Sequence, residues 1–172
     1  NLQVGPIKIF TDGSIGAKTA WTTEGYWGED SNRGISMYSD EELAGIVDKS
    51  WQADFSVAVH AIGDAAIEQA IDILERRKAD EYDVPYPDRM EHVEMVTEKQ
   101  LSRMKSSGII ASLQPNFIEQ WGKPGGMYEE RFGSDRYQKL NPLRKFINAE
   151  VPLALGSDCM PFDPFYGLHS AV

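Results

Sequence analysis

The segments FSVAVH (residues 55–60) and VPLALGSD (residues 151–158) decide the fold, because both alternate small and bulky residues and end in a polar side chain. Alternate residues of an extended strand lie on the same face. The faces that carry His60 and Asp158 therefore carry small residues, while the valines and leucines point the other way. A barrel produces this pattern, since one face packs on helices and the other faces a narrow interior. A doubly wound sheet should be bulky on both faces.

Apolar runs alternate with amphipathic helical patterns along the whole 172-residue chain. The expected strands cover residues 4–11, 55–60, 89–93, 109–114 and 151–157. The expected helices cover residues 40–53, about four turns from residue 64, residues 97–107 and residues 141–149. This βα order indicates a parallel sheet with right-handed crossovers. We predict a single α/β domain over residues 1–172, built as a partial TIM-type (β/α) barrel of about five parallel strands.

Helix boundaries follow from local signals. Ser39 with Glu42, and Thr97 with Gln100, form capping boxes, and Gly108 is expected to end the second of these helices. Helical spacing predicts a buried stripe on the helix that starts near residue 64. The stripe consists of Ile67, Ala70, Ile71 and Leu74.

Two long segments are expected to lack regular structure, the Gly- and Trp-rich residues 12–38 and residues 115–140. The second is too long for a simple connector and is typical of a lid or binding segment. Its Trp121, Tyr128 and Phe132 could contact an apolar substrate or pack against the base of the loop. The pair Asn141-Pro142 should then be the N-cap and first residue of the next helix.

Composition limits the possible functions. With 17 basic and 27 acidic residues, the formal charge of −10 argues against a nucleic-acid partner. The single cysteine excludes an internal disulfide framework and a Cys-rich zinc module. No apolar run approaches the roughly 20 residues that span a bilayer, so no membrane partner is expected. No signal peptide is visible, which gives a cytoplasmic default, although the chain does not begin with Met.

Four side chains are candidates for chemistry. His60, His92 and Asp158 end three predicted strands, and Lys8 lies near the end of the first. Active sites of (β/α) barrels form at this rim. Two imidazoles and a carboxylate that converge there are typical of a zinc-type site, where the metal lowers the pKa of bound water to about 7.

Structural explanations compete with each of these assignments. A lone histidine at a strand end is usually a satisfied structural residue, and an isolated lysine is usually a surface residue. The apolar neighbours of Lys8 nevertheless predict its burial, which requires a partner or a chemical role. Asp12 and Asp64 are expected to serve a turn and a helix N-cap.

Two further residues near the end of the chain are given structural roles. His169 is expected on a helix surface or the barrel rim. Cys159, directly after Asp158, should point away from the site as a small buried apolar residue.

Four blocks in this order resemble the metal-dependent amidohydrolase superfamily: KIFTDGS (residues 8–14), HAIGD (residues 60–64), RMEH (residues 89–92) and GSD (residues 156–158). They are most similar to the branch that contains N-substituted formamide deformylase and the YtcJ-like proteins. The resemblance implies that the five strands correspond to barrel strands four to eight and that residues 161–172 start the last helix.

By this resemblance, His60 and His92 are metal ligands from the fifth and sixth strands, and Lys8 is the fourth-strand lysine that the family can carboxylate to bridge two metals. Asp158 is the eighth-strand carboxylate that contacts the metal and activates the hydrolytic water. The cofactor implied is a divalent metal, most often zinc, and the substrate is a small molecule with an amide or formamide-like C–N bond.

The sequence departs from the family pattern in two respects. With histidines only at 60, 92 and 169, it has no His-x-His pair of a first strand, and three βα units and a small β-sandwich are also missing. We therefore expect a piece of a larger hydrolase, inactive alone and weak in metal binding because the coordination shell is not closed.

Besides a C–N hydrolase, the sequence leaves open an inactive half-barrel and a different metal-dependent enzyme. The chain is either part of a hydrolase or a catalytically inactive half-barrel for assembly or binding. A phosphoesterase or deaminase would share the metal chemistry of the first alternative. Two unpaired sheet edges predict a homo-oligomer in either case.

Overall fold

A computed structural model describes residues 4–79, 82–160 and 163–172. Its sheet has five parallel strands in the order β1-β2-β3-β4-β5. The strands are β1 (Ile7–Phe10), β2 (Val57–Ala61), β3 (Arg89–His92), β4 (Ile110–Leu113) and β5 (Leu153–Leu155). A strand order that follows the chain without reversal is that of a barrel arc, whereas a doubly wound sheet reverses. The prediction of a partial (β/α) barrel is confirmed.

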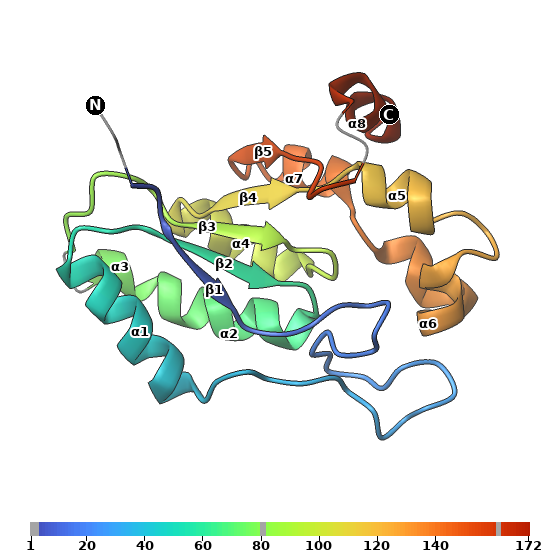
Figure 1. Ribbon diagram of the computed structural model, residues 1–172, viewed down its shortest axis with the longest axis horizontal. Helices are drawn as coiled ribbons and strands as arrows, with labels where there is room; N and C mark the ends of the chain where they lie inside the picture. Colours follow the sequence, from blue (N-terminus) through green and yellow to red (C-terminus); the bar gives the residue numbers. More distant parts are fainter. Residues whose placement is uncertain (1–3, 80–81, 161–162) are drawn as a thin grey trace.

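Eight α-helices and one 3-10 helix are found in the part of the chain that the structure describes. They are α1 (Asp40–Gln52), α2 (Asp64–Leu74), α3 (Arg76–Ala79), α4 (Glu98–Ser107), α5 (Asn116–Trp121), α6 (Met127–Arg136), η1 (Tyr137–Lys139), α7 (Leu143–Asn148) and α8 (Pro164–Ser170). Helices α1, α2 and α4 run along one side of the sheet, while α5 and α6 lie beyond the carboxyl ends of the strands (Figure 1). We call the helix-covered side the outer face and the opposite side the inner face.

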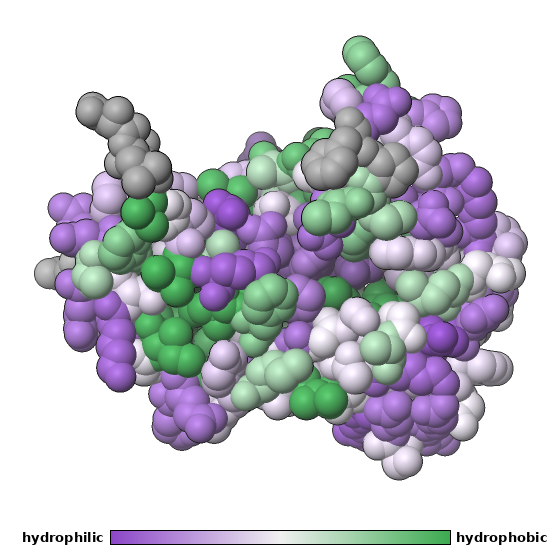
Figure 2. Space-filling view, viewed as in Figure 1, coloured by the Kyte–Doolittle hydropathy of each residue, from purple (hydrophilic) through white to green (hydrophobic). Residues whose placement is uncertain are grey.

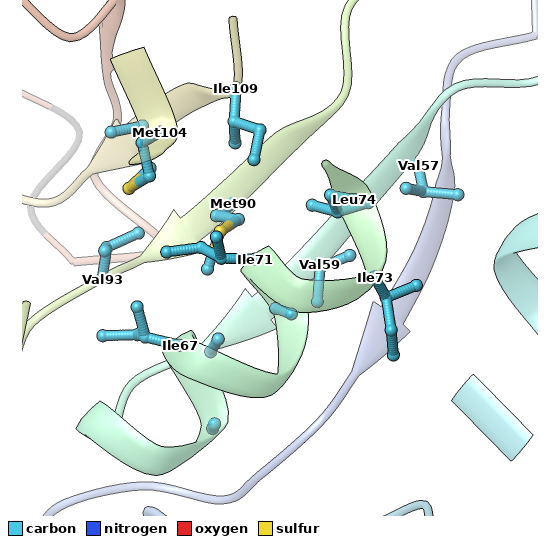
Figure 3. Packing of buried hydrophobic residues seen from close by; sticks show 14 of the residues in the cluster. Val57, Val59, Ile67, Ile71, Ile73, Leu74, Met90, Val93, Met104 and Ile109 are labelled. Carbon is cyan, nitrogen blue, oxygen red and sulfur yellow. The ribbon is translucent and has the colours of Figure 1, made fainter. Parts of the chain in front are cut away.

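The main core lies between the outer face and the helices. Ile67 and Ile71 of α2 are fully buried, as are Val57 and Val59 of β2 and Met90 of β3. Figure 3 shows the α2 side chains directed toward these strands. All four residues of the predicted stripe are buried, which confirms the helical periodicity.

The predicted helix signals are present at atomic level. Ser39 with Glu42, and Thr97 with Gln100, form reciprocal capping boxes. Gly108 ends α4 in the left-handed region with a φ of 73°, which glycine adopts without strain. The helix predicted from residue 64 is divided at Glu75 into α2 and α3.

Two expectations for residues 115–142 are wrong. Residues 115–140 form α5, α6 and η1 rather than an irregular loop. Their periodicity is interrupted by glycine, and Gly133 is non-helical inside α6. Asn141 is not an N-cap, because its side chain bonds to Glu94 and Tyr128, and α7 begins only after Pro142.

A second core lies beyond the carboxyl ends of the strands. Residues 12–38 contain no helix or strand beyond an isolated bridge between Tyr26 and Glu29. They pack on α6, where the Tyr26 and Phe132 rings stack 5.0 Å apart and Trp27 N donates to Arg131 O at 2.8 Å. The two segments predicted as loops therefore form one cap over this end of the sheet.

Both edges of the sheet, and part of its inner face, are exposed in this chain. Phe10 on β1 is 53% exposed, and Leu155 on β5 is 50% exposed. Figure 2 shows hydrophobic residues among hydrophilic ones on the visible face. The described residues contain no helix with the length and apolar character needed to cross a membrane.

Two expectations near the end of the chain are also tested. Cys159 is exposed rather than buried, because Asp158 and Cys159 have φ values of 46° and 61° and do not continue the strand. His169 is exposed on α8, as expected for a helix surface. The last helix begins at Pro164, and residues 161 and 162, where we expected its start, lie outside the described residues.

Candidate active site

The four predicted site residues line one cavity of about 370 Å³ at the carboxyl ends of the strands. Lys8 and His60 lie on the inner face, as the pairings of Lys8 with Ala58 and of Phe10 with His60 require. His92 and Asp158 reach the cavity from the ends of β3 and β5. Residues up to 150 positions apart in sequence are thus brought to one place, as in barrel active sites.

The hydrogen bonds of His60 fix the protonation of its ring. Its Nε2 lies 2.9 Å from the Gly13 carbonyl oxygen and 3.4 Å from Asp12 Oδ1. A carbonyl can only accept, so Nε2 carries the proton and a neutral ring has its lone pair on Nδ1. Burial lowers the pKa of His60, which favours that neutral ring. Nδ1 is buried without a hydrogen-bond partner among the described residues.

His92 reaches the cavity through an unusual backbone conformation. Strict alternation would put His92 on the outer face with Met90, since Glu91 pairs with His60 on the inner face. The φ of 75° at His92 and of 50° at Val93 breaks the pleat. The ring then lies edge-on to His60 with a centroid separation of 4.5 Å.

The environment of His92 also favours a neutral imidazole. His92 is 6% exposed, and its Nδ1 is buried without a hydrogen-bond partner among the described residues. Burial, followed by the proximity of His60, lowers the pKa of His92 to about 4. Two neutral imidazoles, each with a buried unpartnered nitrogen, face the same cavity.

Lys8 differs from its expectation. The residue is exposed rather than buried, because its apolar neighbour Ile9 faces the helices while Lys8 faces the open inner side. Its ammonium lies 5.0 Å from the Phe10 ring centroid. Partial desolvation lowers its pKa, against the opposing attraction of Glu91 and Asp158. Asp158 is exposed at the cavity mouth.

The donor set suits a metal only in part. A metal-bound histidine usually donates its second ring N–H to a carbonyl or carboxylate, and His60 has this arrangement with Gly13. The unpartnered nitrogens of His60 and His92 suit the same use. Within residues 4–79, 82–160 and 163–172, however, no group of three His, Cys, Asp or Glu side chains is arranged to hold a metal ion.

Comparison with known proteins identifies the family. Residues 1–172 match the Amidohydrolase family. The chain belongs to this family. It is 31% identical over 176 residues to a Bacillus subtilis (strain 168) protein named "Putative amidohydrolase YtcJ", and 30% identical over 174 residues to the Arabidopsis thaliana protein LONG AFTER FAR-RED 3. Each match covers 99% of this chain but only 32% and 29% of the relatives. The chain thus spans about a third of their length.

Solved structures lead to the same family-level result. An uncharacterized metal-dependent hydrolase from Pyrococcus furiosus superposes with a TM-score of 0.84 and 28% identity, over 98% of this chain and 34% of that protein. One from Pyrococcus horikoshii OT3 gives a TM-score of 0.83 and 32% identity, over 98% and 33%. The resemblance to the YtcJ-like amidohydrolases is confirmed.

Asp12 and Asp64, for which structural roles were expected, connect elements of this amidohydrolase chain. Buried Asp12 accepts hydrogen bonds from the backbone N–H groups of Trp21, Ile62 and Gly63, and burial raises its pKa to about 6. Gly63 is required there, because a Cβ would lie 1.8 Å from Trp21 O. Asp64 is the first residue of α2 rather than its N-cap, and its carboxylate accepts from Thr23 N at 2.9 Å.

Sequence reasoning missed Glu94, a cavity-lining carboxyl that is only 2% exposed. Its Oε2 accepts hydrogen bonds from Tyr128 Oη and, at 3.1 Å, from Asn141 Nδ2. Burial raises the pKa of Glu94 to about 7. Its position two residues after His92 suggests that it lies near the site. Strand alternation ends at His92, however, and so does not predict where the Glu94 side chain points.

The aromatic residues of the segment 115–140, which was predicted as a loop, lie in or against the second core. Tyr128 and Phe132 are buried in the second core and Trp121 packs against it, and Trp121 and Tyr128 also line the cavity. Packing at the base of this segment is therefore confirmed, while contact with a substrate stays a prediction. Helices α5 and α6 bring the aromatic side chains to the cavity.

Proposed function

We propose that this chain supplies part of the active site of a metal-dependent hydrolase that cleaves a non-peptide C–N bond, of the amide or formamide type, in a small molecule. One observation carries the proposal. His60 and His92, with ring centroids 4.5 Å apart, each have a buried unpartnered nitrogen at a cavity that Lys8 and Asp158 also line.

Each side chain has a proposed role. His60 and His92 would hold a divalent cation, zinc foremost, through neutral nitrogens, and Lys8 would be a further ligand after carboxylation. The ion supplies a water of lowered pKa as the nucleophile. Asp158 would contact the ion, take the proton of the attacking water and return it to the leaving nitrogen. Further ligands would come from residues outside this chain.

A second candidate function is an inactive half-barrel that serves in assembly or binding. The absence of a three-residue ligand group in the described part of the chain favours it, as do the exposed sheet edges at Phe10 and Leu155. For either function we propose a cytoplasmic homo-oligomer with no nucleic-acid or membrane partner. The acidic composition, with a formal charge of −10, supports the nucleic-acid part of this proposal.

Metal content after dialysis against zinc separates the two functions. Because the coordination shell is not closed in this chain, we expect the 172-residue chain to bind zinc weakly and the double variant His60→Asn/His92→Asn to bind less, as measured by elemental analysis at equilibrium in the dialysis. His169→Asn is the matched control, because His169 is exposed on α8 and does not line the cavity.

Circular dichroism of the parent chain, the double variant and the control is used to check that all three are equally folded. Equal zinc in the double variant would contradict the proposed ligands. Absence of zinc from the folded parent chain would favour the assembly function.

A further inference from the structure

One wall of the cavity is aromatic. The Phe117 ring stacks on His92 at a centroid separation of 6.0 Å, Trp121 lies 4.5 Å from Phe117, and Tyr128 lies 6.2 Å from Trp121. Phe117, Trp121 and Tyr128 all line the cavity. His92 thus connects the candidate metal side of the cavity to an aromatic surface of the kind that binds apolar groups and organic cations.

Glu94 is a carboxyl at this aromatic surface, and its orientation is fixed. Tyr128 Oη and Asn141 Nδ2 both donate to Oε2, and these two donors lie 3.2 Å from each other. The backbone of Asn141 adds a bond from its N–H to the Glu94 carbonyl oxygen at 2.8 Å. Residues from α6 and from the turn before α7 therefore hold the Glu94 side chain in one position.

The two carboxyl oxygens of Glu94 differ in their partners. All hydrogen bonds of the side chain to the described residues are made by Oε2. Oε1 is therefore the oxygen that remains available to a ligand. Glu94 lines the cavity and is only 2% exposed. A purely structural role for Glu94 would explain the hydrogen bonds of Oε2 but not why Oε1, in a buried residue, has no hydrogen-bond partner among the described residues.

We propose that Phe117, Trp121, Tyr128 and Glu94 form a substrate subsite for a protonated amine on an apolar stem, whose N–H donates to Glu94 Oε1. The aromatic rings would contact the stem and the cation, and the carboxyl would select the amine by a charge-assisted hydrogen bond. This subsite rests on the proposed function for the reacting bond: the substrate would be an amide-type compound that also carries an amino group.

The substitution Glu94→Gln tests the subsite while preserving its framework. The amide oxygen can accept from Tyr128 and Asn141 in place of Oε2, and the amide NH₂ then replaces Oε1 with a donor. The probes are 2-phenylethylammonium, the neutral 2-phenylethanol and the anionic 3-phenylpropionate, titrated by calorimetry and ligand-observed NMR in buffer of about pH 8 with EDTA, where Glu94 is ionised and the amine is still protonated. Since no metal is present, failure of the metal proposal leaves this measurement intact.

We expect the 172-residue chain to bind 2-phenylethylammonium more tightly than the other two probes. Glu94→Gln should raise the Kd of the amine on the order of tenfold and leave that of 2-phenylethanol unchanged. Glu98→Gln, at an exposed position of α4, makes the same change in charge and should have no effect. Trp121→Leu should weaken binding of both the amine and the alcohol.

Several results would overturn the subsite. These are equal amine binding by Glu94→Gln and the parent chain, tighter binding of the anionic or neutral probe, amine binding that Trp121→Leu does not change, and failure of all three probes to bind. Thermal unfolding of each variant identifies loss of structure. If Glu94→Gln is unfolded, Tyr128→Phe serves in its place, because it removes one donor to Oε2 and should alter amine binding while retaining the aromatic ring.

Discussion

Strands β2 and β5 have the same alternation of small and bulky residues, yet their surroundings are opposite. All five residues of β2 are buried, whereas all three residues of β5 are exposed. The outward-facing Val57 and Val59 of β2 are at most 1% exposed, but Leu153 and Leu155 of β5 are 37% and 50% exposed. The pattern therefore determines which face a side chain occupies, and the neighbouring elements determine whether that face is covered.

The neighbours of the two strands explain this difference. Helices α1 and α2 both contact β2, which is also paired on both sides by β1 and β3. Strand β5 is the sheet edge and pairs only with β4. The following helix, α8, packs on α5 instead of covering the outer face of β5. The carboxyl ends of both strands nevertheless reach the same cavity, with His60 near the end of β2 and Asp158 just after β5.

The largest expected effect is at the covered strand. Ile71→Ala in α2 removes a side chain that is 0% exposed and packs in the main core with β2. We expect it to lower the free energy of unfolding by about 2–5 kcal/mol, through lost burial and the cavity left behind. The measurement is urea denaturation followed by circular dichroism.

The matched variant at the open strand is Leu153→Ala, which should cost about 1 kcal/mol or less because the side chain is already partly in water. Similar losses for the two variants would mean that β5 is as well covered as β2 in solution. That outcome would break the comparison between them.

Much of this architecture follows from local sequence. The capping boxes at Ser39 and Thr97, the left-handed Gly108 and the buried stripe of α2 depend on residues within a few positions of one another. The βα order then determines the parallel sheet. The residues at strand ends, His60 and Asp158, could be expected at a common cavity because parallel strands end at the same edge.

The remaining features depend on contacts that local patterns do not contain. His92 enters the cavity through a positive φ that a non-glycine residue adopts only where its surroundings require it. Asn141 is a residue type that is favoured at helix N-caps, but its side chain instead donates hydrogen bonds to Glu94 and Tyr128, which are distant in sequence. The exposure of Lys8 depends on the open inner face, which apolar neighbours in sequence cannot reveal.

An intermediate effect is expected from the buried carboxyl at the cavity. Burial raises the pKa of Glu94 from 4.5 to about 7, so the folded chain retains a proton that the unfolded chain releases between these pH values. Its contribution to stability must then fall as pH rises from about 4.5 to 7. In EDTA, the unfolding free energy of the parent chain minus that of Glu94→Gln should decrease over this range on the order of 1–3 kcal/mol.

The difference between the two proteins is required because His92 acts in the opposite direction. Its pKa, lowered to about 4, makes the folded chain more stable as pH rises toward 6.5. The parent chain and Glu94→Gln share this contribution, so it cancels in the difference between their unfolding free energies. A difference that stays constant from pH 4.5 to 7, or increases, would show that Glu94 is ionised in the folded chain throughout.

The smallest effect on stability, and a clear effect on association, is expected at the open edge. Leu155→Lys adds a charge to a half-exposed position of an edge strand, where lysine opposes pairing with another chain. We expect a change in unfolding free energy below about 1 kcal/mol, together with a shift from dimers or larger species toward monomer in sedimentation velocity. Lys145→Leu, which removes a charge on helix α7 away from the edge strand, is the control and should not favour monomer. If the parent chain is already a stable monomer at all concentrations, the exposed β5 edge does not drive self-association, and its exposure then needs no partner copy.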